Sequence, residues 1–328
     1  MIPSALIDAI ADEGKAVADL AAQLGRKIAI DPRTLLERDI ALQPPGLFSP
    51  NGYCRLVAAS DGWIAVNLAR EDDRAAIPAW LECDETADPW VAVTNHARHR
   101  TIAILIERAK LLGMPVAALK EADVQPSNPL APNVLPQNPH SVLDLSALWA
   151  GPLCGGLLAQ AGIAVTKVED PARPDPTAIT TPDHNHRLNG QKRRLTMPLH
   201  SPDLLDAVAG ADILVTSARA HALARLGLTP QALFARNPGL IWVAITAHGF
   251  AGENAMRVGF GDDAAAAGGL VGWTSDAPQF LGDALADPLT GLRAARLALR
   301  AITAGQSGII DVALAATAAD FATKAGLR

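Results

Sequence analysis

The sequence predicts an α/β protein with two domains, a large one built around a parallel sheet and a smaller α+β one. Its 328 residues suffice for two domains of ordinary size. A proline-rich stretch at residues 124–140 divides the chain, and strands alternate regularly with helices only after it. Because hydrophobic residues make up 49% and charged residues 19%, the chain can fill such cores and is not expected to be disordered.

Residues 1–123 predict the small α+β domain. Two strand-like runs, CRLVAAS and WIAVNLA, flank the pair Asp61-Gly62, and aspartate–glycine between alternating apolar residues indicates a hairpin. Helical patterns surround this hairpin. One of them, HRTIAILIERAKLLG, ends at Gly113, as expected where a helix stops.

Residues 124–140, VQPSNPLAPNVLPQNPH, contain five prolines and three asparagines and show no periodic apolar pattern. Proline fixes φ and disfavours helix at the preceding residue, so this segment is expected to be an extended linker. A proline-rich crossover on the surface of a single domain is the alternative interpretation.

Residues 141–328 predict the large domain. The strand SVLDLS leads into the helix GPLCGGLLAQAG and the strand IAVTKVE. The helix LLDAVAGA, the strand DILVTS, the helices HALARLG and TPQALFARN, and the strand LIWVAIT follow. Near-continuous apolar strands indicate a parallel sheet with helices on both faces, a Rossmann-like arrangement. Since ligands of such sheets bind beyond the carboxyl ends of the strands, the loops at 146–152, 169–176 and 216–221 are candidates for the site.

Charge and composition exclude several classes of function. The net charge of −6 argues against a broad nucleic-acid surface and against an anionic membrane. The N-terminus has early acids and no basic start, and no apolar run approaches about 18 residues, so neither a signal peptide nor a membrane span is expected. Cys54, Cys83 and Cys154 form no CxxC pair, which fits a reducing compartment. We therefore expect a cytoplasmic protein. His184 and His186 lie in an expected loop without carboxylate or cysteine partners, so no metal is expected.

The segment VLDLSALWAGPLCGGLLAQAGIAVTKVEDPARPDP, residues 142–176, resembles the first βαβ unit of class III CoA-transferases. That group includes formyl-CoA and carnitine-type CoA-transferases and α-methylacyl-CoA racemases. Further motifs follow in the family's order, in LNGQKRRLTMPL, in the stretch from DILVTS to HGFAG, in ALADPLTGLRAARLALRA and in GIIDVALAATAADF. The resemblance implies an enzyme that moves CoA between an acyl-CoA and a carboxylic acid. It also implies a homodimer, with coenzyme A as substrate and no permanently bound cofactor.

The order of the parts departs from that family. The segment SPNGYCRLVAASDGWIAVNLA resembles the family's small domain, which normally follows the large one but here precedes it. We interpret this order as a circular permutation, which is tolerated where chain termini lie close together at a surface. Whether the dimer is interlocked, as is typical of the family, stays open because interlocking depends on the path of the chain.

Within the resemblance, Asp287 takes the position of the catalytic aspartate, four residues before Gly291. Its carboxylate would attack the thioester carbonyl and pass through a mixed anhydride to an aspartyl-CoA thioester. The alternative is that Asp287 merely caps a helix whose first turn contains Pro288. Asp283 is a nearby competitor that has no glycine four residues later.

The resemblance also implies a set of CoA-binding positions. They are the loop after the first strand, basic positions, and a triplet that stands where the family usually has Asn-Phe-Arg. These residues are Ala147, Leu148, Trp149, Ala150, Arg173, Lys192, Arg193, Ser217, Ala218, Arg219 and Arg225. For each cation a solvated surface charge is the alternative.

Two other functions are open. Family racemases draw one base from a Gly-His-Asp motif, but this chain has Gly259, Phe260 and Gly261 there. Phenylalanine cannot carry a proton, so a CoA-thioester racemase or isomerase is less favoured. The family's acid is also absent at Gly261, which keeps a non-catalytic CoA-ester-binding subunit open. His248, Phe260 and Gly261 are expected at the rim of the active site.

Overall fold

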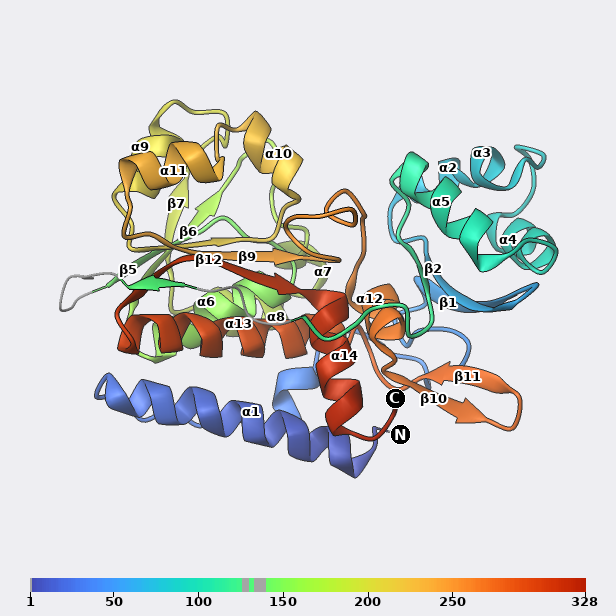
Figure 1. Ribbon diagram of the computed structural model, residues 1–328, viewed down its shortest axis with the longest axis horizontal. Coiled ribbons are helices and arrows are strands. Elements are labelled where there is room, and N and C mark those ends of the chain that lie inside the picture. Colours follow the sequence, from blue (N-terminus) through green and yellow to red (C-terminus); the bar gives the residue numbers. More distant parts are fainter. Residues whose placement is uncertain (1, 126–129, 133–139) are drawn as a thin grey trace.

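The computed structural model describes residues 2–125, 130–132 and 140–328, and a seven-stranded sheet forms its large lobe (Figure 1). The strand order is β4-β12-β9-β8-β5-β6-β7. The strands are β4 (Ala131–Pro132), β5 (Ser141–Asp144), β6 (Ala164–Glu169), β7 (Arg193–Thr196), β8 (Ile213–Thr216), β9 (Ile241–Thr246) and β12 (Gln306–Ala313). All neighbours are parallel except β4, which pairs antiparallel with the start of β12. The predicted parallel sheet is confirmed, and β4 is an edge strand that the sequence did not indicate.

Helices cover both faces of this sheet, as predicted. One face packs against α6 (Ala150–Gln160), α13 (Ala286–Thr303) and α14 (Leu314–Lys324), and α1 (Ser4–Gln23) packs on the outside of α13 and α14. The other carries α9 (Asp203–Ala209), α10 (Ala220–Arg225) and α11 (Pro230–Arg236). Strand residues alternate between the two cores: Val142 and Val243 join the first, Leu143 and Trp242 the second. This alternation follows from the two-residue period of a strand and explains why these strands are apolar throughout.

The small lobe is a three-stranded antiparallel sheet covered by short helices. The strands are β1 (Cys54–Ala59), β2 (Gly62–Asn67) and β3 (Val116–Ala118), and the helices are α2 (Glu71–Ala75), α3 (Ile77–Leu81), α4 (Pro89–Ala97) and α5 (Ile102–Leu112). The predicted hairpin is confirmed, with Ala59 paired to Gly62. Gly113 ends α5 in the left-handed conformation, as expected.

Helix α12 (Gly261–Gly268) lies between the lobes and contacts β2, β3 and α14. The hairpin of β10 (Val271–Thr274) and β11 (Ala277–Phe280) follows it. In the remaining loops lie the 3₁₀ helix η1 (Thr34–Leu36) and the helices α7 (Thr177–Thr180) and α8 (Pro182–Asn189). Among the described residues, no helix combines the length and the apolar character needed to cross a membrane.

Residues 1–123 do not pack as one unit. Leu6, Ile10 and Val17 of α1 belong to the core of the large lobe, and Glu13 accepts hydrogen bonds of 2.5 Å from Arg293 Nε and Arg296 Nε. An amphipathic pattern shows that a helix has a face to bury but does not name its partner, which is why the expected boundary was wrong for α1. Most of the expected linker 124–140 lies outside the described residues.

Candidate functional site

Asp287 is the second residue of α13, and the turn before it is held in an unusual conformation. Leu285 occupies the N-cap position, so the interpretation of Asp287 as the cap is wrong. Ala284 has φ 45°, a region that residues with a side chain rarely adopt. Its N–H donates to Asp262 Oδ1 (2.7 Å), and its carbonyl accepts from the Asp287 N–H (2.9 Å). The backbone that presents Asp287 is therefore fixed from both sides.

Gly261 makes room for the Asp287 carboxylate. A Cβ placed on Gly261 would lie 2.3 Å from Asp287 Oδ2 and 2.6 Å from the Ala284 carbonyl oxygen. A glycine is therefore required for this close approach. The missing acid at position 261 is consistent with a carboxylate that enters the same space from α13.

Two further carboxylates, held by residues of the N-terminal segment, complete the cluster. Arg38 donates to both oxygens of Asp283, from Nε (2.6 Å) and Nη2 (2.7 Å). Asn51 Nδ2 donates to Asp262 Oδ2 and to Asp283 Oδ1, each at 2.7 Å, so both of its amide hydrogens are used. We call Arg38, Asn51, Asp262, Asp283 and Asp287 the carboxylate cluster.

The cluster sets the protonation of its own members. Burial raises the pKa of Asp287 to about 7; Asp262 and Asp283 add to the rise, while Arg38 and the Gly261 amide oppose it. Burial and the charge of Asp283 raise the pKa of Asp262 to about 6. At neutral pH Asp287 is thus divided between its acid and its ionised form, and a buried carboxyl group with a pKa raised in this way is typical of a functional site.

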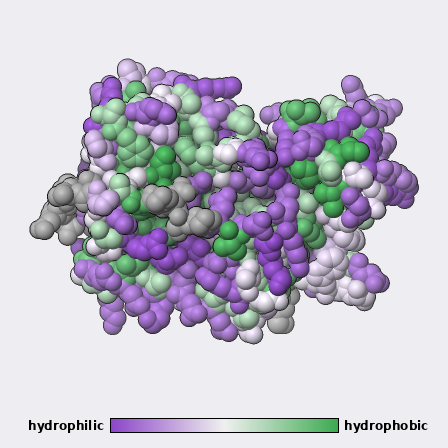
Figure 2. Space-filling model, viewed as in Figure 1, coloured by the Kyte–Doolittle hydropathy of each residue, from purple (hydrophilic) through white to green (hydrophobic). Residues whose placement is uncertain are grey.

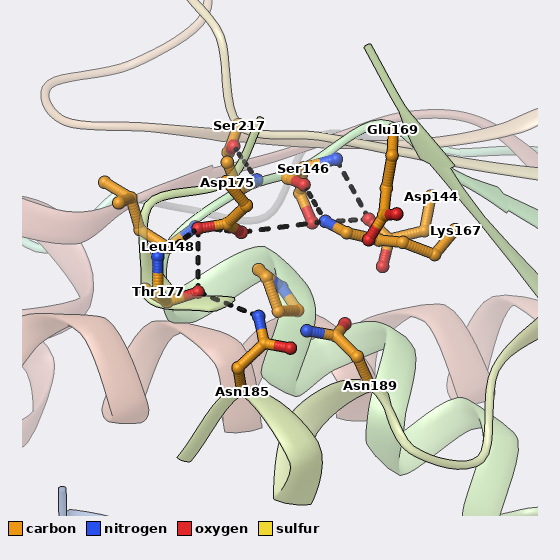
Figure 3. Close-up of polar contacts among 12 residues, drawn as sticks. Asp144, Ser146, Leu148, Lys167, Glu169, Asp175, Thr177, Asn185, Asn189 and Ser217 are labelled. Atoms are coloured by element: carbon orange, nitrogen blue, oxygen red, sulfur yellow. Dashed lines mark hydrogen bonds and ion pairs between the residues drawn. The ribbon is translucent and has the colours of Figure 1, made fainter. Parts of the chain in front are cut away.

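The loop after β5 is tied to its neighbours by backbone hydrogen bonds (Figure 3). The Leu148 N–H donates to Asp175 Oδ2 (3.0 Å), and the Ala147 N–H donates to Ser217 Oγ (3.0 Å). Asp175 Oδ1 in turn accepts from Thr177 Oγ1 (2.7 Å). Leu148 has φ 69°, a second strained position. The structure therefore brings Ala147, Leu148 and Ser217 together at the carboxyl edge of the sheet.

Trp149 connects this loop to the carboxylate cluster. Its ring lies 5.2 Å from Arg38 Cζ and meets the His184 ring edge-on at 4.6 Å. Ala150 begins α6, and a Cβ on Gly291 would lie 2.6 Å from its carbonyl oxygen. The starts of α6 and α13 are therefore in direct contact, so Trp149 and Ala150 lie next to the turn that carries Asp287.

Lys192 and Arg193 do not join this site. Lys192 is buried, and its ammonium donates to Asp144 Oδ2, the Pro152 carbonyl and Asn189 Oδ1, each at 2.8 Å. These bonds use all three of its hydrogens, so the structure gives Lys192 a structural role. Arg193 is exposed, and its partner on the neighbouring strand β6 is Thr166. Thr166 lies three residues before the carboxyl end of β6, so Arg193 is roughly 10 Å from the carboxyl edge of the sheet.

Other cations do gather at the carboxyl edge, where a notch separates the lobes in Figure 2. After burial, the charges of Arg70 and Arg225 lower the pKa of Arg219, so each of these two cations lies near Arg219. Arg70 comes from the small lobe and lies 5.6 Å from the Phe260 ring. We call Arg70, Arg219 and Arg225 the cation cluster. Arg173 is exposed in the loop after β6, and Ala218 packs against the second core.

His248 is buried, and burial lowers its pKa to about 3, so the ring is neutral. Its Nε2 and Asp263 Oδ2 find no hydrogen-bond partner among the described residues, and both lie within 3.4 Å of a Cβ placed on Gly259. His184 and His186 lie on α8, which corrects the expected loop. Across residues 2–125, 130–132 and 140–328, no three His, Cys, Asp or Glu side chains converge to hold a metal ion.

Comparison with known proteins decides the family. Residues 140–327, more than half of the chain, match CoA-transferase family III. The chain belongs to this family. The matched residues include Asp287 and the loop after β5, whereas Arg38, Asn51 and Arg70 lie outside them. Asn51 lies in the segment that resembles the family's small domain, but no sequence motif marked Arg38 or Arg70, because they approach the site only through the fold.

Family III members similar to this chain include named CoA-transferases. A succinyl-CoA–D-citramalate CoA-transferase of Chloroflexus aurantiacus is 31% identical over 194 residues, which are 53% of this chain and 48% of that protein. A succinate–glutarate CoA-transferase of Agrobacterium fabrum is 30% identical over 197 residues, 53% and 49% of the two chains. The chain spans about half the length of the curated relatives that it matches.

Solved family structures share the fold. Rv3272 from Mycobacterium tuberculosis superimposes with a TM-score of 0.51 at 28% identity, covering 59% of this chain and 57% of that one. A CAIB/BAIF family protein from Brucella suis gives 0.51 at 29% identity, covering 58% and 56%. The family resemblance and the α/β fold expected from the sequence are thus confirmed.

Proposed function

We propose that the protein transfers coenzyme A from an acyl-CoA to a carboxylic acid and that Asp287 carries the CoA between the two half-reactions. The placement of Asp287 supports this most: a carboxylate with a pKa near neutrality, on a fixed turn, beside the loop after the first strand of a family III fold. Family membership alone would not single out this carboxylate among the three in the cluster.

The reaction balances with Asp287 alone as the covalent group. The ionised carboxylate attacks the thioester carbonyl of R–CO–SCoA, forming a mixed anhydride and releasing CoA thiolate. The thiolate attacks the Asp287 acyl carbon of the anhydride, giving aspartyl-CoA thioester and the carboxylate R–COO⁻. An acceptor R′–COO⁻ reverses these steps, which yields R′–CO–SCoA and restores Asp287. Burial, together with the charges of Asp262 and Asp283, keeps the Asp287 pKa high, while Arg38 keeps part of it ionised.

The nucleotide end of CoA is proposed to bind at the cation cluster. Arg219 and Arg225 from the large lobe offer guanidinium groups to phosphates, against the protein's overall negative charge. Arg70 from the small lobe lies near them but is already paired with Asp73, to which its Nε donates (2.9 Å). The pantetheine arm would follow the loop from Ala147 to Trp149 toward Asp287. A homodimer, as the resemblance implies, is part of the same proposal, and the molar mass in solution measured by light scattering tests it.

The experiment incubates the protein with succinyl-CoA and a set of carboxylic acids, including glutarate and citramalate, and measures new CoA thioesters by mass spectrometry. Formation of a new thioester that disappears in Asp287→Asn and persists in Asp276→Asn supports the proposal, since Asp276 is exposed in the β10–β11 turn. Incorporation of deuterium at Cα without CoA transfer would instead favour a racemase.

A further inference from the structure

Arg38 holds Asp283 with one edge of its guanidinium group and leaves a second edge unused. Asp283 accepts from Nε (2.6 Å) and Nη2 (2.7 Å), which form the first edge. Nη1 and the other hydrogen of Nη2 form the second edge, and across residues 2–125, 130–132 and 140–328 they donate to no protein atom. Because the group is planar, these two N–H bonds run parallel and match the two oxygens of a carboxylate. We call this second edge the Arg38 fork.

The surroundings of Arg38 fix the orientation of the fork. Trp149 packs against the guanidinium group, with Cζ 5.2 Å from the centre of the ring. Asn51 also donates to Asp283 (2.7 Å) and so holds the carboxylate that Arg38 binds. The next residue, Asp39, accepts from two N–H groups at the start of α8 (3.0 and 2.8 Å), which anchors the backbone. A cation held in this way loses little conformational freedom when it binds an anion.

Arg38 acts on Asp287 without being bonded to it. Of the charges that affect the pKa of Asp287, that of Arg38 has the largest effect, and it lowers the pKa. No hydrogen bond or ion pair joins the two side chains. Both residues are partly exposed, and the Arg38 side chain keeps 20% of its surface accessible. An anion from the solvent can therefore reach the guanidinium group while that group stays close to the reacting carboxyl.

The two half-reactions exchange one negative charge at this place. Arg38 and Asp283 neutralise each other, so ionised Asp287 gives the site an excess of negative charge. In the aspartyl-CoA thioester Asp287 is neutral, and the acceptor acid then brings in a carboxylate of its own. Asp262 and Asp283 repel that carboxylate, so it must bind where a cation offsets them. The incoming carboxylate can take over the attraction that Arg38 exerted on ionised Asp287.

We propose that the Arg38 fork binds the reacting carboxylate of the acceptor acid and holds it beside the Asp287 thioester. An oxygen of the bound carboxylate attacks the thioester carbonyl of Asp287, which forms a mixed anhydride and expels CoA thiolate. The thiolate then attacks the acceptor carbonyl of the anhydride, giving R′–CO–SCoA and returning Asp287 as a carboxylate. This inference rests on the proposed function. It adds the group that receives the acceptor acid, and that group lies outside the residues that match the family.

The test prepares the aspartyl-CoA intermediate of the full chain and follows its reaction with two different nucleophiles. Acetyl-CoA, succinyl-CoA and hexanoyl-CoA are the donors, and small molecules are removed by gel filtration. The intermediate is then mixed either with the acid of the donor that formed it or with hydroxylamine. Hydroxylamine has no carboxylate and attacks the same thioester, releasing CoA and leaving the Asp287 hydroxamate. The two rates therefore separate the binding of a carboxylate from the reactivity of the thioester.

Arg38→Lys keeps a positive charge for Asp283 but has no fork. We expect its rate with the acid to fall by about 30-fold and its rate with hydroxylamine to stay within about threefold of the parent. Formation of the intermediate should slow by a similar factor, because it is the reverse of the reaction with the acid, so the variant is incubated longer with the donor.

The matched control is Arg236→Lys, which changes an exposed arginine paired with Asp206 and should alter neither rate. The double variant Arg38→Met/Asp283→Asn, which removes both charges of the pair, serves if Arg38→Lys misfolds.

The possible failures are distinguishable. Equal losses with the acid and with hydroxylamine, or a folded variant that forms no intermediate, would show that Arg38 only positions Asp287. An unchanged rate with the acid would show that Arg38 binds no acceptor. Each of these results overturns the present inference and leaves the proposed function intact. Failure of all three donors to form an intermediate in the parent protein overturns the proposed function itself.

Discussion

At the scale of single residues, the site consists of one carboxylate held partly out of water beside two others. The sequence could locate Asp287 and the unusual Gly261, because both fall within recognisable motifs. It could not locate Arg38, which lies 245 residues from Asp283 in the chain yet pairs with it at 2.6 Å. A contact between distant segments leaves no local pattern to read.

The first prediction concerns pH. Because only the ionised form of Asp287 attacks the thioester, kcat/KM should rise with pH through about 7, the pKa of that carboxyl. Arg38→Gln removes the positive charge that favours ionisation, so the rise should move to higher pH. Rates measured from about pH 5 to pH 9 check this. A profile with no step near neutrality, or a shift to lower pH in the variant, contradicts it.

The second prediction concerns stability. The pKa of Asp287 is about 7 in the folded protein against 3.8 as the ordinary value, so the folded state binds more protons between these limits. Ionisation there costs stability, which is lost as pH rises through about 7. Asp287→Asn should therefore raise the free energy of unfolding by about 2 kcal/mol at pH 8 and by little at pH 4. Urea unfolding measures the free energy of unfolding at both pH values. If Asp287→Asn were less stable than the parent protein at pH 8, the raised pKa of Asp287 would be contradicted.

The third prediction concerns the close approach at Gly261. Gly261→Ala places a Cβ against Asp287 Oδ2 and the Ala284 carbonyl, so the turn must shift. We expect a loss of about 100-fold or more in transfer rate and about 2 kcal/mol in stability. Gly46→Ala is the matched control, since no atom lies within 4 Å of its added Cβ and its φ is ordinary. Equal effects of the two substitutions would contradict the account.

At the scale of elements, apolar patterning predicted the buried strands and α6. Each strand is apolar throughout because its side chains pack alternately into the cores on the two sides of the sheet. Helix α8 was missed, since its sequence PDHNHRLN is mostly polar and has too few apolar residues to show a helical period. Strand β4 has two residues and no periodic signal at all. The basic positions 192 and 193 looked equivalent in sequence, but Lys192 is buried just before β7, and Arg193, the first residue of that strand, is exposed.

The fourth prediction separates a structural cation from a binding one. Lys192→Met leaves Asp144 buried without its partner and should cost about 3 kcal/mol of stability, part of which the added change Asp144→Asn should recover. Arg219→Ala should change stability little and weaken CoA binding about tenfold. Chemical unfolding and calorimetry measure the two quantities. If the Lys192→Met protein had normal stability but bound CoA weakly, Lys192 would be a binding residue and its assignment as a structural cation would be wrong.

At the scale of the whole molecule, the N-terminal segment contributes to both lobes and to the site. Helix α1 packs on α13 and α14, the loop after it supplies Arg38 and Asn51, and the small lobe supplies Arg70. Both chain ends lie on the same side of the molecule in Figure 1, and α1 contacts α14. This arrangement supports the proposal that the chain is a circular permutation of the family's usual order. The sequence predicted the two parts but not that α1 joins the large one.

The fifth prediction follows from that proposal. A variant that joins Arg328 to Ile2 through a flexible glycine–serine linker, and that begins at Leu130 and ends at Gln125, should fold to the same structure. Its unfolding midpoint and CoA affinity should stay within a few-fold of the parent, because the packed elements and the carboxylate cluster are all retained. A variant that folds but no longer binds CoA would show that the present chain order is needed to build the site.

The most direct measurement is peptide mapping by mass spectrometry after the protein is mixed with an acyl-CoA in the absence of acceptor and quenched in acid. We predict a peptide containing Asp287 whose mass is raised by CoA less one water, and which hydroxylamine converts to the hydroxamate. An adduct on Asp283 or Asp262, or transfer that continues unchanged in Asp287→Asn, would contradict the assignment of Asp287 as the residue that carries CoA.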